Sequence, residues 1–446
     1  MTRRLPTRGA AAALALVLLG GACTTESSDG AGGDGGDGSA TAADIEVGQS
    51  TWDPDNVEVD MPELECEQTA EDPTRGVTDT EVRVGALATI TGPTTSLWGD
   101  AVSGAKARLE RANAEGGVHG RTITMVAEED DGLESSRSID AARRLAQNEQ
   151  VFAVVPAISQ VPSYADVLCE EVVPYFGWGF TPAYCNNSLG FGFNGCQVPT
   201  IGEYPSSAKV TFQPLLGDTD KTIVLVGNET ESARRGIENI AGAMEEAGFD
   251  IVAEMPVLPA DQPITDPTPY VQEIMTANDG EPPAAVWYIA DFSNTNTMTQ
   301  AIAGAGFQGL QFNSVGYDPR LKEADMFEGT YVYLQWLPFE ESDHPFVAQM
   351  IEDLEEYAPD APHSLPTAAG YLAADMFVEA LEATGPDLTV DSFLETLNGG
   401  DFTYDPEGMF GGSHWPINHV IATPCGTIVK LEDHEYSLAV PLSCAD

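Results

Sequence analysis

The chain has 446 residues, of which 71 are Asp or Glu and 19 are Lys or Arg, so its formal net charge is −52 at neutral pH. Such an acidic chain repels nucleic acid and anionic lipid surfaces, which excludes both as expected partners. At this length a chain can bury a large hydrophobic core, which normally divides into two domains.

An apolar run near the amino terminus indicates where the protein is located. Residues 10–22 are apolar or small, three arginines precede them, and Cys23 follows. The run is too short to span a bilayer but fits the apolar part of a secretory signal. The small residues before Cys23 resemble the lipobox of bacterial lipoproteins, except that Leu19 lies one position too early. We expect a signal peptide over 1–22 and a lipid anchor at Cys23, on the outer face of the cell membrane; ordinary signal-peptide cleavage is the alternative.

Residues 23–77 are expected to form a flexible tether and an acidic leader. Residues 30–38 read GAGGDGGDG and contain no large apolar side chain, a composition typical of flexible linkers. About twenty such residues have a mean reach of roughly 25 Å. The globular part would stay near the membrane without touching it.

Six cysteines remain besides the one in the lipobox, an even number that suits disulfides in an oxidising compartment. Six cysteines allow about fifteen pairings, among which the sequence alone cannot choose. Proximity in the sequence favours the pairs Cys185–Cys196 and Cys425–Cys444, which leaves Cys66 to pair with Cys169. No CxxC pair occurs, so a zinc ribbon or a thioredoxin-like site is not expected.

From residue 81 onward, short apolar runs alternate with amphipathic segments. A first group of strands is expected at 82–87, 123–127, 151–155 and 172–176, with helices near 102–112, 136–148 and 162–170 between them. A second group is expected at 222–226, 251–257, 284–289 and 310–315. This alternation predicts an α/β fold of two doubly wound lobes, each with a parallel sheet covered on both faces.

Residues 185–204 are rich in Gly, Asn and Pro and are expected to cross between the two lobes. Gly190, Gly192 and Gly195 spell GxGxxG, but no apolar strand leads into them and no helix pattern follows. The dinucleotide-binding fingerprint needs both, so nucleotide binding is not expected. Later in the chain we expect a strand at 331–336, helices at 345–357 and 367–384, and strand-like runs at 417–423 and 427–431.

Four segments together carry a resemblance to a known family. They are VGALATITGPTTSLWGD at 84–100, GGVHGR at 116–121, the acidic residues 128–131, and VPYFG at 173–177. In their order and spacing they are similar to ABC transporter solute receptors of the leucine/isoleucine/valine-binding type. The resemblance implies a type I periplasmic-binding-protein fold, in which crossing segments join two lobes and a cleft between them holds the ligand.

The resemblance also implies how the chain is divided into lobes and which partners it binds. Lobe 1 is expected to comprise 78–203 and 332–400, and lobe 2 to comprise 204–331 and 401–446, the latter ending in a hairpin. The implied partners are a small-molecule ligand and the permease and ATPase subunits of an ABC importer, with no cofactor and a monomeric receptor.

In a doubly wound lobe the loops after the strands face the cleft, which in lobe 1 means 91–99, 157–163 and 177–184. Trp98 stands at the family's aromatic position and is expected to cover an apolar ligand group, unless it is a core residue. Ser159 begins a helix that could receive a carboxylate, although it could be a helix cap alone. Thr181 resembles a family residue that donates to the same carboxylate, or Pro182 merely fixes a turn there. Phe180 lies beside it in the same loop.

An amino-acid ligand needs an acidic partner for its ammonium group. Glu229, Asp291 and Asp318 each follow a strand of lobe 2 and are the candidates. Each could equally be a surface charge or a helix cap. If such a partner is missing, amides, urea-like compounds or aromatic acids become the expected ligands.

Other chemistry is less well supported by the sequence. Adjacent residues in the acidic run 128–131 would point to opposite sides of a strand end, which favours capping over a metal site or a catalytic pair. His414 and His419 are five residues apart, which fits neither a helical zinc pair nor a strand period. No GxSxG motif occurs. We therefore expect a tethered, non-enzymatic receptor for a small polar solute; the alternatives are a sensor of the same fold and an extracellular hydrolase.

Overall fold

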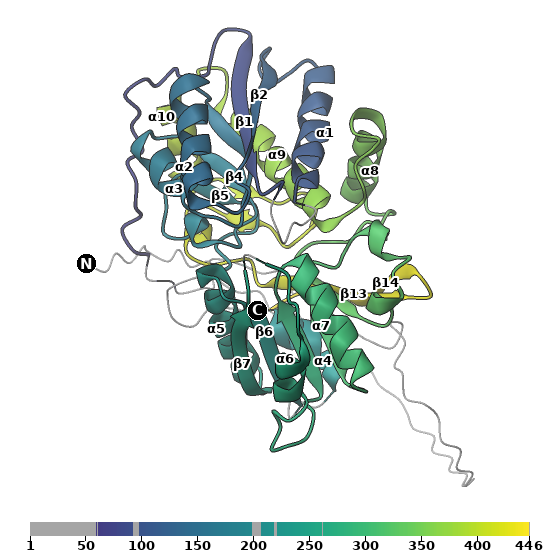
Figure 1. Ribbon diagram of the computed structural model, residues 1–446. Coiled ribbons are helices and arrows are strands. Elements are labelled where there is room, and N and C mark those ends of the chain that lie inside the picture. Colours follow the sequence, from purple (N-terminus) through teal and green to yellow (C-terminus); the bar gives the residue numbers. More distant parts are fainter. Residues whose placement is uncertain are drawn as a thin grey trace, which may run out of the picture. The chain divides into compact units, whose positions relative to one another are not determined.

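Five parallel strands form the first sheet of the protein, seen in a computed structural model (Figure 1) that describes residues 59, 61–91, 98–198, 207–217, 221–260 and 262–445. Across the sheet the strands are β2 (Thr122–Asp130), β1 (Glu81–Ala88), β3 (Ala153–Ile158), β4 (Tyr175–Gly177) and β5 (Gly190–Gly192). Every residue of β3 is buried. A strand this apolar fits the centre of a sheet with helices on both faces.

The strand order decides which face each helix of this sheet covers. Helix α1 (Asp100–Ala114) leads from β1 to β2, whereas α2 (Ser135–Arg143) leads from β2 back past β1 to β3. Because such crossovers are right-handed, the two helices lie on opposite faces, and α3 (Tyr164–Glu170) shares the face of α2. A π-helix, Arg144–Asn148, extends α2. Later helices return to this lobe, with α9 beside α1 (Figure 1): α8 (Pro345–Tyr357), α9 (Leu365–Thr384) and α10 (Val390–Asn398).

The second sheet has seven strands and two separate apolar faces. Its order is β14 (Glu435–Cys444), β13 (Cys425–Glu432), β10 (Tyr331–Leu334), β9 (Leu310–Asn313), β8 (Ala285–Ile289), β6 (Thr222–Asn228) and β7 (Asp250–Leu258). Strand β13 is antiparallel to both of its neighbours, and the other pairs are parallel. One face packs on α4 (Ala208–Leu216) and α5 (Glu231–Glu246), the other on α6 (Thr268–Ile274) and α7 (Phe292–Gly304). Both sheets belong to one compact unit, residues 41–446.

The passage of the chain from lobe 2 back to lobe 1 differs in two details from the expected lobe boundaries. Strand β10 belongs to the second sheet, so the chain leaves that sheet after Leu334 and not at 331. Phe402, Phe410 and Trp415 pack in the core of the first lobe. Of the final segment, the strands β13 and β14 join the second sheet, and they are the yellow strands beside it in Figure 1.

The expected strand at 417–423 is wrong. Residues 417–419 form a 3₁₀ turn instead. The side chain of Asn418 accepts a hydrogen bond from the amide of His414 at 2.6 Å and donates one to the carbonyl of Ile421 at 3.0 Å. These side-chain bonds to the backbone replace the pairing that a strand would need.

The glycine motif serves close packing of the crossing segments. A Cβ on Gly192 would lie 2.7 Å from the Cα of Gly179, and one on Gly195 would lie 2.3 Å from the carbonyl oxygen of Ile421. Gly195 also has a φ of +84°, which disfavours a larger residue. Three segments distant in sequence can therefore approach backbone to backbone.

The three expected disulfides are confirmed: Cys66–Cys169, Cys185–Cys196 and Cys425–Cys444. Among the described helices, none combines the length and apolar character needed to cross a membrane. The signal peptide, Cys23 and the glycine-rich tether lie outside the described residues.

Candidate ligand-binding site

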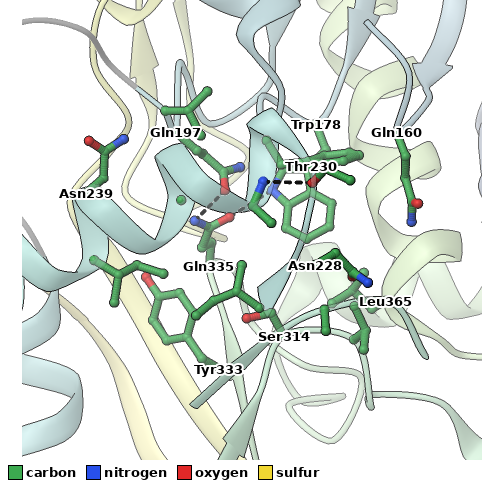
Figure 2. A pocket seen from close by; sticks show the side chains of 18 of the residues that line it. Gln160, Trp178, Gln197, Asn228, Thr230, Asn239, Ser314, Tyr333, Gln335 and Leu365 are labelled. Atoms are coloured by element: carbon green, nitrogen blue, oxygen red, sulfur yellow. Dashed lines mark hydrogen bonds between the residues drawn. The ribbon is translucent and has the colours of Figure 1, made fainter. Parts of the chain in front are cut away.

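A cavity of about 590 Å³ lies where the carboxyl ends of the strands of the two sheets face each other. Lobe 1 contributes loop residues that follow β2, β3 and β4. Lobe 2 contributes residues at the ends of β6, β8, β9 and β10 and residues of the helices α4 and α5. Figure 2 shows side chains from both lobes pointing into this space. Open α/β sheets bind ligands at this edge, and the volume lies within the usual range for ligand pockets.

Aromatic side chains form the lobe 1 wall of the cavity. Trp98 stacks on Phe180 with ring centroids 5.3 Å apart. Trp178 lies 5.0 Å from Phe180 and meets Trp336 edge-on at 5.3 Å. All four residues line the cavity. This wall offers a ligand mainly apolar surface.

A second aromatic group lines the cavity from lobe 2. The rings of Phe212 and Trp287 are 4.6 Å apart, and Tyr333 lies 5.5 Å from Trp287. The polar atoms of this group are already engaged, because Trp287 Nε1 donates to Ser314 Oγ at 3.1 Å and the hydroxyls of Ser207 and Tyr333 are 2.7 Å apart. The rings therefore present their apolar parts.

Side-chain amides form a hydrogen-bonded ring beside the lobe 1 wall. Gln335 Oε1 accepts from Trp178 Nε1 at 2.8 Å and from Asn194 Nδ2 at 2.9 Å. Gln335 Nε2 donates to Gln197 Oε1 at 2.8 Å, and Gln197 Nε2 donates to Asn194 Oδ1 at 3.1 Å. Figure 2 shows Trp178, Gln197 and Gln335 in this arrangement. The ring joins lobe 1 and the first crossing segment to the segment that follows β10.

The structure separates the predicted lobe 1 residues into two pairs. Trp98 and Phe180 line the cavity, whereas Ser159 and Thr181 do not. Both hydroxyl residues are buried, and the hydroxyl of Thr181 lies beside that of Tyr164. Ser159 Oγ donates to the carboxylate of Asp131 and accepts from the amide of Val161 at 2.9 Å.

Asp131, the last member of the acidic run, is fully buried behind the cavity wall. Besides the bond from Ser159, its carboxylate accepts from Thr89 Oγ1 at 3.2 Å and from the amide of Leu133 at 2.9 Å. Burial raises the pKa of Asp131, and these hydrogen bonds oppose that rise. Loop residues after β1, β2 and β3 thus converge on a carboxylate of the protein itself.

Asp130 binds the residues that directly follow β1. Its carboxylate accepts from the amides of Ile90 at 2.9 Å and Thr91 at 3.0 Å and pairs with Arg137 at 2.8 Å. Burial alone would raise the pKa of Asp130, but the hydrogen bonds from Thr91 and its neighbours outweigh burial and lower the pKa to about 2. The expected capping role of the acidic run is confirmed at this residue.

Of the three lobe 2 candidates, only Asp291 lines the cavity. It caps α7, and its carboxylate accepts from the amide of Asn294 at 3.0 Å, from Asn294 Nδ2 at 2.8 Å and from Asn228 Nδ2 at 2.9 Å. Burial raises the pKa of Asp291. Glu229 is exposed, and Asp318 is buried in an ion pair with Arg320 away from the cavity.

Charged groups are scarce among the described lining residues. Asp291 and the solvent-exposed Glu134 are the carboxylates in this set, which contains no Lys, Arg or His. In the sequence, residues 92–97 and 199–206, which lie outside the described part, contain Glu203 but no Lys, Arg or His. In the described part of the chain, no group of three or more His, Cys, Asp or Glu residues could hold a metal ion.

Two well-buried lining residues have polar atoms with no hydrogen-bond partner among the described residues. They are Nε1 of Trp336, whose side chain is 0% exposed, and Oγ1 of Thr423, 5% exposed. Trp336 follows the end of β10, and Thr423 precedes the start of β13. Both therefore lie next to the paired positions Leu334 and Thr427 of these strands. Buried polar atoms are usually satisfied, so an unpaired polar atom in a residue that lines the cavity makes that residue a candidate ligand contact.

Sequence reasoning located the lobe 1 segments of the site but missed most of its side chains. Trp178 and Gln197 lie in a predicted cleft loop and in the predicted crossing segment, and Gln335 and Trp336 end a predicted strand. Nothing in the local sequence singled them out, because Trp178 and Gln335 meet across a separation of 157 residues.

Two doubly wound sheets that enclose a ligand-sized cavity at their carboxyl ends define a two-lobed solute receptor. The chain belongs to the periplasmic binding protein family, whose model matches residues 81–435. This membership confirms the family resemblance and the fold class expected from the sequence, and it implies an extracytoplasmic location.

Individual relatives agree with this assignment. The "Leu/Ile/Val-binding protein homolog 7" of Brucella abortus (strain 2308) is 31% identical over 101 residues, which are 22% of this chain and 25% of the relative. The match thus spans about a quarter of the length of that curated relative.

Two solved structures share the fold across most of the chain. A fatty acid ABC transporter substrate-binding protein from Thermomonospora curvata superposes with a TM-score of 0.69 at 18% identity, over 83% of this chain and 94% of that one. The branched-chain amino acid transporter substrate binding protein LivJ from Streptococcus pneumoniae, in complex with isoleucine, gives 0.63 at 15% identity, over 82% and 99%.

Proposed function

We propose that the protein is a membrane-tethered receptor that binds a small molecule in the described cavity and delivers it to the permease and ATPase subunits of an ABC importer. The observation that carries this proposal is the cavity itself, which both lobes line at the carboxyl ends of their strands. Because ligand contacts come from both lobes, ligand binding favours their closed arrangement, which a permease could recognise.

The volume of the cavity indicates how large a ligand it can hold. The sequence left an amino acid, an amide and an organic acid as candidates, and the two structural neighbours are a fatty acid ABC transporter substrate-binding protein and a complex with isoleucine. A water molecule takes about 30 Å³ in the liquid. A cavity of about 590 Å³ therefore has room for a ligand considerably larger than leucine.

A thermal-shift screen of amino acids, amides, organic acids and aliphatic compounds tests the receptor function. A ligand present at about 100 times its dissociation constant should raise the free energy of unfolding by about 2.7 kcal/mol. Uptake of the same compound should fall in a strain that lacks the gene. If no small molecule stabilises the protein, the receptor proposal is wrong.

The same experiments separate the alternatives. A sensor would bind the compound, but deletion of its gene would leave uptake unchanged and alter a cellular response. A hydrolase would convert the compound, and mass spectrometry of the incubated mixture would detect the product.

The tether is tested at Cys23. Stable anchoring depends on acyl chains at that residue, so Cys23→Ala should release the protein into the medium or leave its signal peptide uncleaved. Fractionation and immunoblotting of the cells measure this. A variant that is fully processed and still bound to the membrane would contradict the anchor.

A further inference from the structure

We propose that the cavity takes an uncharged, largely apolar ligand whose polar groups are oxygen acceptors, such as an amide or an ester. The inference rests on the receptor function proposed above and names the chemical class of its solute. It follows from three observations: the internal carboxylate of Asp131 at the lobe 1 edge, the engaged carboxylate of Asp291 in lobe 2, and unpaired polar atoms in two residues that line the cavity.

The first observation concerns the place where the family resemblance would put a ligand carboxylate. Ser159 was expected to donate to that group, but its hydroxyl donates to Asp131. Thr89 and the amide of Leu133 donate to the same residue, at 3.2 and 2.9 Å. The residues next to this cluster, Gly132 and Gln160, line the cavity. Asp131 therefore takes the Ser159 donor that was expected for a ligand carboxylate, and its own charge disfavours a second anion nearby.

The second observation concerns the ammonium group of an amino acid. Asp291 is the buried carboxylate among the described lining residues, and three N–H groups of Asn228 and Asn294 already point at its two oxygens. Glu134 is exposed to water, where an ion pair contributes little. An ammonium group entering the cavity would lose its hydration without a matching buried partner among the described residues, which is costly.

The third observation shows what the cavity does offer. Trp336 Nε1 can only donate a hydrogen bond, and Thr423 Oγ1 can donate or accept. Neither has a partner among the described residues, and both are well buried. A ligand carbonyl or ether oxygen that reached either atom would satisfy it, while the two aromatic groups would surround the apolar part of the ligand.

Matched pairs of ligands test the proposal directly. Calorimetric titrations should compare amides with acids of the same carbon skeleton, for example benzamide with benzoate and octanamide with octanoate, alongside leucine and isoleucine. We expect the amide of a bound pair to bind at least tenfold more tightly than the acid, with an affinity that is constant from pH 6 to 8. Tighter binding of an acid or an amino acid would overturn the inference while leaving the receptor function intact. A protein that binds some other solute but neither an amide nor an ester would overturn it as well.

Asp131→Asn tests the internal carboxylate, because it removes the charge and keeps the shape. Octanoate should then bind at least tenfold more tightly than to the parent protein, and octanamide should bind within twofold of it. Glu128→Gln, three residues earlier on β2 and exposed in an ion pair with Lys106, is the control and should change neither affinity. An unchanged preference for the amide in Asp131→Asn would overturn the role of Asp131.

Thr423→Val provides a second variant that does not disturb Asp131. It removes a hydroxyl that has no partner in the described structure, so the melting temperature should not fall. The affinity for the amide should fall about fivefold. Unchanged affinity would show that the hydroxyl does not bind the ligand and would remove this support for a ligand with oxygen acceptors.

Discussion

At the scale of single residues, Trp98 tests where the ligand lies. Truncation of a buried aromatic anchor typically costs about 2 kcal/mol of binding or more, so Trp98→Ala should weaken affinity by about thirtyfold or worse. Trp98 also packs in the core of lobe 1, so the variant should lose about 3 kcal/mol of stability as well. Calorimetric titration and urea unfolding measure the two effects.

A second buried tryptophan provides the matched control for Trp98. Trp415 packs in the same core but does not line the cavity. Trp415→Ala should lower stability by a similar amount and leave affinity within twofold. Equal losses of affinity in the two variants would mean that Trp98 acts only through the fold.

For Ser159 we expect a loss of stability without a loss of affinity, because its hydroxyl bonds to Asp131 and the residue does not line the cavity. Ser159→Ala removes a donor from a buried carboxylate, so the free energy of unfolding should fall by about 1 to 3 kcal/mol. Affinity for an uncharged ligand should stay within twofold. A loss of affinity without a loss of stability would place the hydroxyl in direct contact with the ligand.

At the scale of secondary-structure elements, the contact between α1 and α9 depends on glycine. A Cβ on Gly370 of α9 would lie 1.8 Å from the carbonyl oxygen of Ala101 in α1. Gly370→Ala would force the helices apart, so we expect a loss of about 2 kcal/mol or more in urea unfolding.

Gly242, in the middle of α5, is the matched control for this glycine. A Cβ there would meet nothing within 4 Å. Gly242→Ala should therefore stabilise the protein by about 0.5 to 1 kcal/mol, because alanine is the better helix former. A destabilisation by both substitutions would show that the close approach is not the cause.

The sequence predicted elements better than contacts. Buried runs such as 153–158 stand out in any parallel sheet, so most strands of both lobes were found within a few residues, whereas β5 at the glycine motif was missed. The run at 417–423 was misread because Asn418 bonds to the backbone on either side, and apolar content does not reveal such bonds. Ser159 shows the same limit in the site, since nothing in its own segment indicates that Asp131, at the end of another strand, takes its hydroxyl.

At the scale of the whole molecule, the disulfides differ in the length of chain that they close. Cys66–Cys169 spans 103 residues and Cys185–Cys196 spans 11. A longer loop restricts the unfolded chain more, by about 4.7 kcal/mol for the first and about 2.8 kcal/mol for the second. Paired Cys→Ala substitutions, compared by urea unfolding, should therefore cost more at Cys66 and Cys169. An equal or reversed order would contradict this explanation.

Four of the six tryptophans in the chain line the cavity: Trp98, Trp178, Trp287 and Trp336. Their indole rings are the main ultraviolet fluorophores of the protein, and the emission of an indole depends on the polarity of its surroundings. A ligand that displaces water from between these rings should shift the emission spectrum to shorter wavelength. The intrinsic fluorescence of the unlabelled protein should thus report how fast the solute enters and leaves, on a timescale that stopped-flow mixing can resolve.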